Sequence, residues 1–204
     1  MKSAAVGFRP HSGWTALVAV SLERGKPVVL LRERVHLVKT FNYAFRQPYH
    51  TAARASLDEG QAFIARVRVE ARQLAYRALR RVQAKLGDAD YRLTCSGHLE
   101  KAGRALPGLE KILAAHPLIH TAEGEFFREV LLHASKKLGL AQFQVREKEL
   151  LPQASKTLRR QAGKLQAQLT ALGKPLGPPW SQDEKFATLV AWLALRTIRG
   201  RGER

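Results

Sequence analysis

The sequence predicts an α/β protein, a mixed sheet of about five strands with helices on both faces. Three runs of apolar and β-branched residues open the chain within 4–20 and 28–37, and Gly and Pro turn residues separate them. Two later alternating segments, 91–95 and 143–147, each follow a helical pattern. Strands joined through a helix usually run parallel, so we expect an antiparallel meander followed by two parallel strands.

Length and composition indicate one compact domain. The chain has 204 residues and 45% hydrophobic content, which is enough for a substantial core. No window approaches the ~20 consecutive apolar residues of a membrane span, so we expect a cytoplasmic protein that does not associate with membranes. The single cysteine, Cys95, excludes an internal disulfide and a cysteine-rich zinc site.

The charge balance is strongly basic. The chain carries 35 basic and 17 acidic residues, for a formal net charge of +18. Such a charge attracts polyanions over long distances, and nucleic acid is the commonest partner of this kind. A generally basic surface would give the same count, and charge does not distinguish DNA from RNA.

Aromatic residues near the N-terminus have two interpretations. Phe8 and Trp14 lie on the first two predicted strands, and we expect both to face the core. Residues 41–51 are aromatic and irregular, which favours a loop anchored to the core. Base stacking is the alternative, because Arg46 and His50 are interleaved with the aromatic residues.

A long helix is predicted over 57–86. It begins at a capping box, Ser56-Leu57-Asp58-Glu59, and apolar residues recur along it every three or four positions. Cations in its last turns would stabilise the helix dipole without any ligand, so its basic face has a structural explanation as well as a functional one. The candidates for phosphate contact on this face are Arg72, Arg77, Arg80 and Arg81.

A second basic surface is predicted on a helix that runs from Pro152 to about Leu172. Its candidates for phosphate contact are Lys156, Arg159 and Arg160. A second capping box, at 181–184, predicts the start of the final helix.

The densest group of polar residues is 116–125. Thr121 is a good N-cap for a helix that ends at Gly139, so His120, Glu123 and Glu125 would lie within one turn of its start. Imidazole and carboxylate groups suit Mg²⁺, Mn²⁺ or Zn²⁺ in different mixtures. Acidic residues in a first turn also stabilise the helix dipole, which is the structural alternative.

The His116-x-x-x-His120 spacing has the length of one helical turn. Pro117 lies between the two histidines, and proline is unfavourable inside a helix. We therefore do not expect His116 and His120 to share a regular helix face.

The order of elements resembles the ribonuclease H-like fold, and the local sequence is similar to RuvC-type Holliday-junction resolvases. Val6 to Trp14 resembles their first strand and turn, 143–158 their fifth strand and following helix, and Asp183 to Ala187 their carboxylate-bearing last helix. The resemblance predicts a ribonuclease H-like domain over 1–195 with an insertion at 97–118. A basic tail would follow at 196–204.

The resemblance implies a two-metal nuclease site with carboxylates from strand one, the end of strand four and the last helix. In this sequence Arg9 occupies the strand-one position. A guanidinium repels metal ions, but it can bind a phosphate or neutralise Asp183. The end of strand four offers carboxylates only at Glu100 or, beyond the insertion, at Glu123.

Three hypotheses follow. The first is a nucleic-acid-binding protein with a lost or remodelled metal site, which needs no cofactor. The second is a nuclease that uses Mg²⁺ or Mn²⁺, with Glu123 and Asp183 as metal ligands; its catalytic residues would be His11, His120, Glu123, Glu125 and Asp183. The third is a basic interaction module, which gel filtration unaffected by nuclease treatment would favour.

Overall fold

The fold was established from a computed structural model, which describes residues 1–39, 43–100 and 105–202. The described residues form one five-stranded mixed sheet in the order β3-β2-β1-β4-β5. The β1–β2 and β2–β3 pairs are antiparallel, whereas β1–β4 and β4–β5 are parallel, as the sequence predicts. The strands are β1 (Lys2–His11), β2 (Trp14–Glu23), β3 (Lys26–His36), β4 (Tyr91–Glu100) and β5 (Ala141–Arg146).

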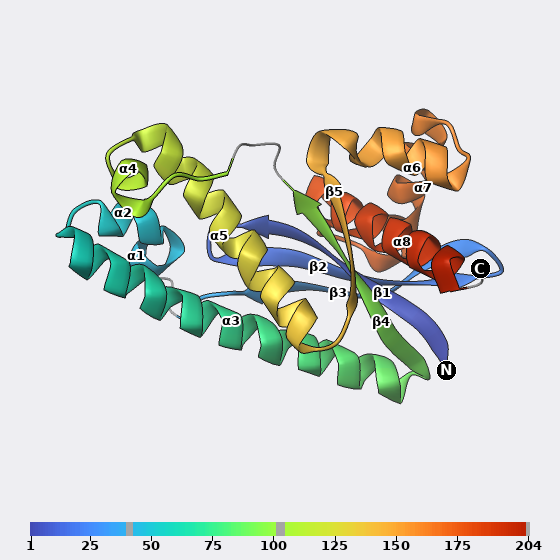
Figure 1. Cartoon of the computed structure of the whole chain (residues 1–204). Coiled ribbons are helices and arrows are strands. Elements are labelled where there is room, and N and C mark those ends of the chain that lie inside the picture. Colours follow the sequence, from blue (N-terminus) through green and yellow to red (C-terminus); the bar gives the residue numbers. More distant parts are fainter. Residues whose placement is uncertain (40–42, 101–104, 203–204) are drawn as a thin grey trace.

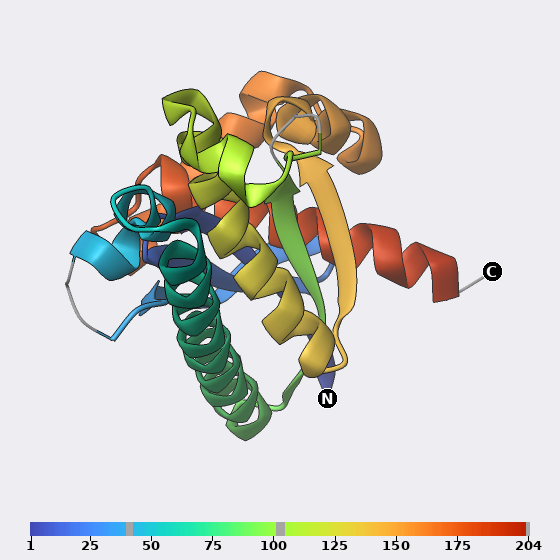
Figure 2. The same ribbon diagram turned by 60° about the vertical axis from the view of Figure 1, so that its left-hand side comes forward.

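Helices cover both faces of the sheet (Figures 1 and 2). One face carries α3 (Leu57–Asp88) and α5 (His116–Lys137), and the other carries α8 (Gln182–Gly202), against which α6 (Leu150–Leu158) and α7 (Ala162–Gly173) pack. The short elements are α1 (Tyr43–Arg46), α2 (Pro48–Ala52), α4 (Leu109–Leu113), η1 (Glu147–Glu149) and η2 (Lys174–Leu176). Within the described ranges, no helix is both long enough and apolar enough to cross a membrane.

The sheet separates two hydrophobic cores. Strand alternation directs Ala4, Val6 and Phe8 toward α3 and α5, and it directs Ala5 toward α8. Two glycines let α8 lie directly on the central strands. A Cβ atom on Gly7 would stand 1.9 Å from the carbonyl oxygen of Ala187, and one on Gly97 would stand 2.4 Å from that of Val190. This close contact fixes the start of α8 over the end of β1.

The predicted start of α5 is wrong. The helix begins at His116, five residues before Thr121, and Pro117 lies in its first turn. Proline is well tolerated there because a first-turn amide has no partner within the helix. The Thr121 hydroxyl donates to the Pro117 carbonyl oxygen at 2.9 Å and does not cap the helix. Glu123 and Glu125 therefore lie in the second and third turns.

Other element boundaries also differ from expectation. The described part of 41–51 contains α1 and α2, not an irregular loop, while residues 41 and 42 lie outside the described residues. The helix expected from Pro152 to Leu172 breaks at Arg159, which adopts a left-handed conformation with φ of 52°. Strand β4 continues to Glu100, and α8 continues to Gly202 through most of the predicted tail.

The predicted core role of the aromatic residues is correct at two positions and wrong at a third. Phe8 is buried, and Tyr49 is buried with its ring centroid 6.2 Å from that of Phe126. Trp14 is only partly buried, and it lies at the candidate site described below.

The glycine contacts give a test of the fold. Gly7→Ala should lower the free energy of unfolding by at least about 1–3 kcal/mol, because the new methyl group overlaps the backbone of α8. Gly87→Ala is the matched control: a Cβ atom there meets no atom within 4 Å, so the variant should gain up to about 1 kcal/mol of helix stability. Urea unfolding measures both. Equal stability of Gly7→Ala and the wild type would contradict this packing of α8 on β1.

Candidate functional site

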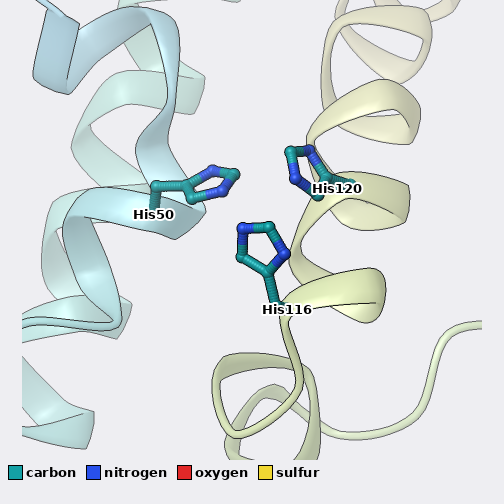
Figure 3. Close-up of side chains that lie close together, drawn as sticks. All are labelled: His50, His116 and His120. Carbon is teal, nitrogen blue, oxygen red and sulfur yellow. The ribbon is translucent and has the colours of Figure 1, made fainter.

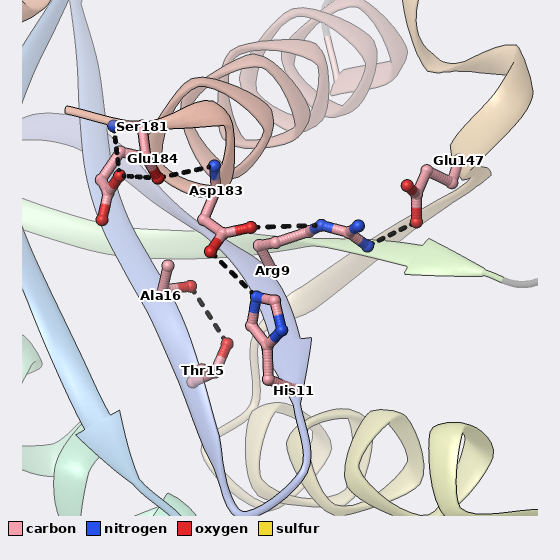
Figure 4. Close-up of polar contacts among 8 residues, drawn as sticks. All are labelled: Arg9, His11, Thr15, Ala16, Glu147, Ser181, Asp183 and Glu184. Carbon is pink, nitrogen blue, oxygen red and sulfur yellow. Dashed lines mark hydrogen bonds and ion pairs between the residues drawn. The ribbon is translucent and has the colours of Figure 1, made fainter. Parts of the chain in front are cut away.

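The candidate site lies where β1 ends against the start of α8, and an ion-pair network forms its centre (Figure 4). Arg9 projects from β1 toward α8, with its guanidinium 5.7 Å from the Phe186 ring centroid. Arg9 Nη1 donates to Glu147 Oε2 at 2.5 Å, and Arg9 Nε lies 3.6 Å from Asp183 Oδ1. The guanidinium therefore stands between two carboxylates. They come from η1, directly after β5, and from the first turn of α8.

An aromatic stack extends the network. His11 Nε2 lies 3.0 Å from Asp183 Oδ2. The His11 ring stacks on Trp14, with centroids 4.2 Å apart and ring planes 9° apart. The Arg34 guanidinium lies 3.7 Å from the Trp14 ring centroid. Trp14 thus packs between an imidazole and a cation, with no face left free to stack on a base.

The start of α8 holds Asp183 in place. The Ser181 backbone amide donates to Glu184 Oε2 at 2.7 Å, and the Asp183 amide donates to Ser181 Oγ at 3.1 Å. The return of Glu184 to the Ser181 amide is one half of the predicted second capping box, whereas Ser181 Oγ accepts from Asp183, one residue earlier than the pattern requires. A carboxylate in a first turn is also favoured by the helix dipole.

Arg32 on β3 holds the segment that leads into α8. Its guanidinium donates to the carbonyl oxygens of Leu176 and Gly177, each at 2.8 Å, and of Pro178 at 2.9 Å, and it also contacts that of Pro179. A groove of about 390 Å³ runs beside this segment. It is lined by Trp14, Arg32, Glu33, Arg34, Pro179, Ser181, Asp183 and Glu184.

These residues do not fit a pair of divalent metal ions. Gly7 on β1 pairs with Gly97 on β4, and both face α8. Two residues further along each strand, the side chains on the same face are Arg9 on β1 and Leu99 on β4. Leu99 is buried in the core beneath α8. Strand four therefore supplies a leucine to this face. Glu100 instead lines a hollow that contains Phe8, on the other side of the sheet. The site has a cation at its centre, where a metal-ion pair needs several oxygen ligands.

The remaining predicted site residues lie elsewhere. His120, Glu123 and Glu125 are on α5, across the sheet from Asp183 and His11. Glu123 is 4% exposed and accepts a hydrogen bond from the His50 backbone amide at 3.1 Å. Glu125 forms an ion pair with Arg128 at 3.2 Å. The five proposed catalytic residues thus do not form one site.

A second polar cluster was not predicted. His50 on α2 faces His116 and His120 on α5, and the three rings point toward one another (Figure 3). The expectation that Pro117 would keep the two α5 histidines apart is wrong, because Pro117 lies in the first turn of an unbroken helix. The spacing of His116 and His120 was the sequence signal for this cluster. His50 had no comparable signal.

Some of the predicted phosphate-binding residues form ion pairs with carboxylates, and others are exposed to solvent. Arg72 pairs with Glu129, and Arg81 pairs with Glu33 at 3.2 Å. Arg77 and Arg80 are exposed, and no carboxylate in the described part of the chain pairs with either. At the end of α6, Lys156 and Arg159 are exposed, and Arg160 lies over the Trp192 ring at 6.0 Å.

Comparison with known proteins identifies structures with a similar fold. No family model and no curated protein sequence matches the chain. Several solved structures match it. One is RuvC of Thermus thermophilus in complex with a Holliday junction substrate, at 11% identity and a TM-score of 0.55, and another is a further structure of Thermus thermophilus RuvC, at 11% identity and a TM-score of 0.54. Each match covers 97% of this chain and 96% of the other. The fold is therefore ribonuclease H-like and similar to that of RuvC, as the sequence predicts.

A buried histidine lies beneath the hollow at the ends of β1, β4 and β5. His98 is 4% exposed, its Nε2 lies 2.9 Å from Ser96 Oγ, and its ring centroid lies 5.1 Å from that of Phe8. Burial lowers the pKa of His98 from the ordinary histidine value of 6.5 to about 3. The native protein therefore holds this imidazole neutral.

This pKa shift predicts a dependence of stability on pH. The unfolded chain protonates His98 below pH ~6.5, and the folded chain does not. The contribution of the neutral His98 to the free energy of unfolding is therefore fully present above that pH and is lost as the pH falls toward 3. His98→Gln should remove up to about 1.4 kcal/mol per pH unit from the slope of unfolding free energy between pH 6 and pH 4. His133→Gln, on α5, is the control for replacing a histidine elsewhere in the chain. A wild-type slope in His98→Gln would contradict the burial.

Proposed function

We propose that this protein binds nucleic acid through a ribonuclease H-like fold in which an ion-pair network replaces the metal site. One observation carries the proposal: the Arg9 guanidinium lies between Glu147 and Asp183 at the end of β1. A guanidinium satisfies carboxylates much as a metal ion would, but it cannot activate water or accept a leaving oxygen as a ligand. Binding without metal-dependent cleavage is the function that this chemistry supports.

The charge and the fold both support nucleic acid as the partner. A net charge of +18 favours a polyanion, and one of the similar structures is RuvC in complex with a Holliday junction substrate. The exposed cations Arg77 and Arg80 on α3, and Lys156 and Arg159 on α6, are available for phosphates. Because both faces of Trp14 are covered, we expect recognition at this site through the phosphate backbone.

Salt dependence tests this binding. Affinity for labelled DNA and RNA, as single strands, duplexes and four-way junctions, should fall steeply with salt. Each phosphate neutralised by a cation contributes about 0.9 to the log–log slope for duplex DNA and about 0.7 for a single strand. Arg77→Gln/Arg80→Gln and Lys156→Gln/Arg159→Gln should each reduce the slope by up to about 1.8. Fluorescence anisotropy at several salt concentrations gives the slopes.

A matched control separates specific contacts from net charge. Arg24→Gln/Lys26→Gln removes the same charge from the exposed tip of the β2–β3 hairpin and should leave the slope nearly unchanged. Equal reductions in all three double variants would show a general effect of charge. Failure of the wild type to bind any of these nucleic acids would contradict the proposed function and favour a basic interaction module.

The Arg9 network predicts a latent metal site. Mg²⁺ at millimolar concentration should not change the melting temperature of the wild type. Arg9→Asp should be less stable without Mg²⁺ and partly restored by it, because an ion that binds only the folded state stabilises that state. Arg9→Met, which supplies no ligand, should be less stable and not restored. Mg²⁺ is the appropriate probe because it prefers oxygen ligands to imidazole.

One result would reverse this assignment. If Mg²⁺ stabilises the wild type and the response disappears in Asp183→Asn, the site binds metal despite Arg9. Cleavage of nucleic acid that a chelator abolishes would then identify a metal-dependent nuclease.

A further inference from the structure

Three imidazoles meet between α2 and α5 (Figure 3). His116 and His120 lie one helical turn apart on the same face of α5, and His50 approaches from α2. The ring centroids are 4.4 Å apart for His116–His120, 4.8 Å for His50–His120 and 5.4 Å for His50–His116. One nitrogen from each ring lies within 4.8 Å of those of the other two. The rings meet nearly edge to face.

This spacing is close to that of a metal centre. Zinc binds imidazole nitrogen at about 2.0–2.1 Å, which places two nitrogens of a tetrahedral site about 3.3 Å apart. His116 and His120 are exposed, so small rotations of their rings can close the remaining distance without disturbing the core. The same exposure leaves a fourth coordination position open to solvent.

A buried carboxylate supports the same interpretation independently. Glu123 is 4% exposed, and its Oε1 lies 3.0 Å from His50 Nδ1 and also accepts the His50 backbone amide. A carboxylate behind a ligating histidine orients the ring and increases its basicity. With Nδ1 facing Glu123, Nε2 is the nitrogen that His50 offers to the cluster. Among the described residues, Glu123 has no ion-pair partner other than His50, and a bound cation would offset this buried charge.

We propose that His50, His116 and His120 bind a divalent transition-metal ion, for which zinc is the best suited. Three neutral nitrogen ligands with an open fourth position match zinc chemistry, and the absence of carboxylate from the direct ligand set disfavours Mg²⁺ and Ca²⁺. The ion would join α2 to the first turn of α5. The site lies across the sheet from the Arg9 network, so this inference does not depend on the proposed nucleic-acid binding.

Metal titration of the full chain without a polyhistidine tag tests the site. After chelator treatment and dialysis, calorimetric titration with Zn²⁺ should show about one ion bound per chain, and Zn²⁺ should raise the melting temperature. Co²⁺ should give visible absorption bands that report its coordination by nitrogen ligands. His116→Ala and His120→Ala should each weaken Zn²⁺ binding by more than about 100-fold and remove these bands. His133→Ala, a histidine on α5 outside the cluster, should match the wild type.

Glu123→Gln tests the orienting carboxylate. It should weaken Zn²⁺ binding by about 10–100-fold while the stoichiometry is unchanged. Because His116 and His120 are exposed, their alanine variants should fold normally, which circular dichroism can verify, and the test does not rely on Glu123→Gln being stable. Absence of stoichiometric Zn²⁺ binding by the wild type, or equal affinity in folded His116→Ala and His120→Ala, would overturn the proposal and leave the cluster as ring packing alone.

Discussion

The contact of α8 with β1 and β4 is the constraint on which the rest of the structure depends. It requires Gly7 and Gly97, because a side chain on either would overlap the α8 backbone. With the helix this close, its first turn reaches the end of β1, and the Asp183 carboxylate comes near the Arg9 guanidinium. Arg32 holds the segment before α8 from the opposite edge of the meander. Backbone packing thus determines where the charged groups meet.

The ion pairs of Arg9 with Glu147 and Asp183 determine which ligands this site can bind. Arg9, Glu147 and Asp183 are each partly shielded from water, with side-chain exposures of 22%, 36% and 25%, so their mutual attraction is stronger than that of ordinary surface pairs. A carboxylate already satisfied by a guanidinium is a poor ligand for a second cation. Asp183, already paired with Arg9 and His11, is therefore poorly suited to hold a metal ion in the geometry described here.

The sequence predicted most of the fold and one half of this site. Alternating apolar residues and Gly or Pro turns located all five strands, and the resemblance brought Arg9 and Asp183 together. Glu147 was not predicted, because a carboxylate after a strand has no pattern that reveals its partner. Leu99 was not predicted because strand β4 extends beyond its clear alternation at 91–95. Local sequence does not determine where a strand ends when pairing with a neighbour extends it.

The histidine cluster was missed for two physical reasons. A proline in the first turn of a helix and a proline inside a helix look alike in sequence, so the pattern predicts a start of α5 after Pro117, whereas the helix begins before it. His50 lies far from His116 in the chain and belongs to a helix too short to show periodicity. Only tertiary packing of α2 on α5 brings them together.

The separation of the two cores by the sheet has an evolutionary consequence. Among the residues that the structure describes, the ion pairs of the Arg9 network and those of the histidine cluster have no member in common, so substitutions on one face should be nearly additive with those on the other. Selection could then reshape one site while the other stays unchanged.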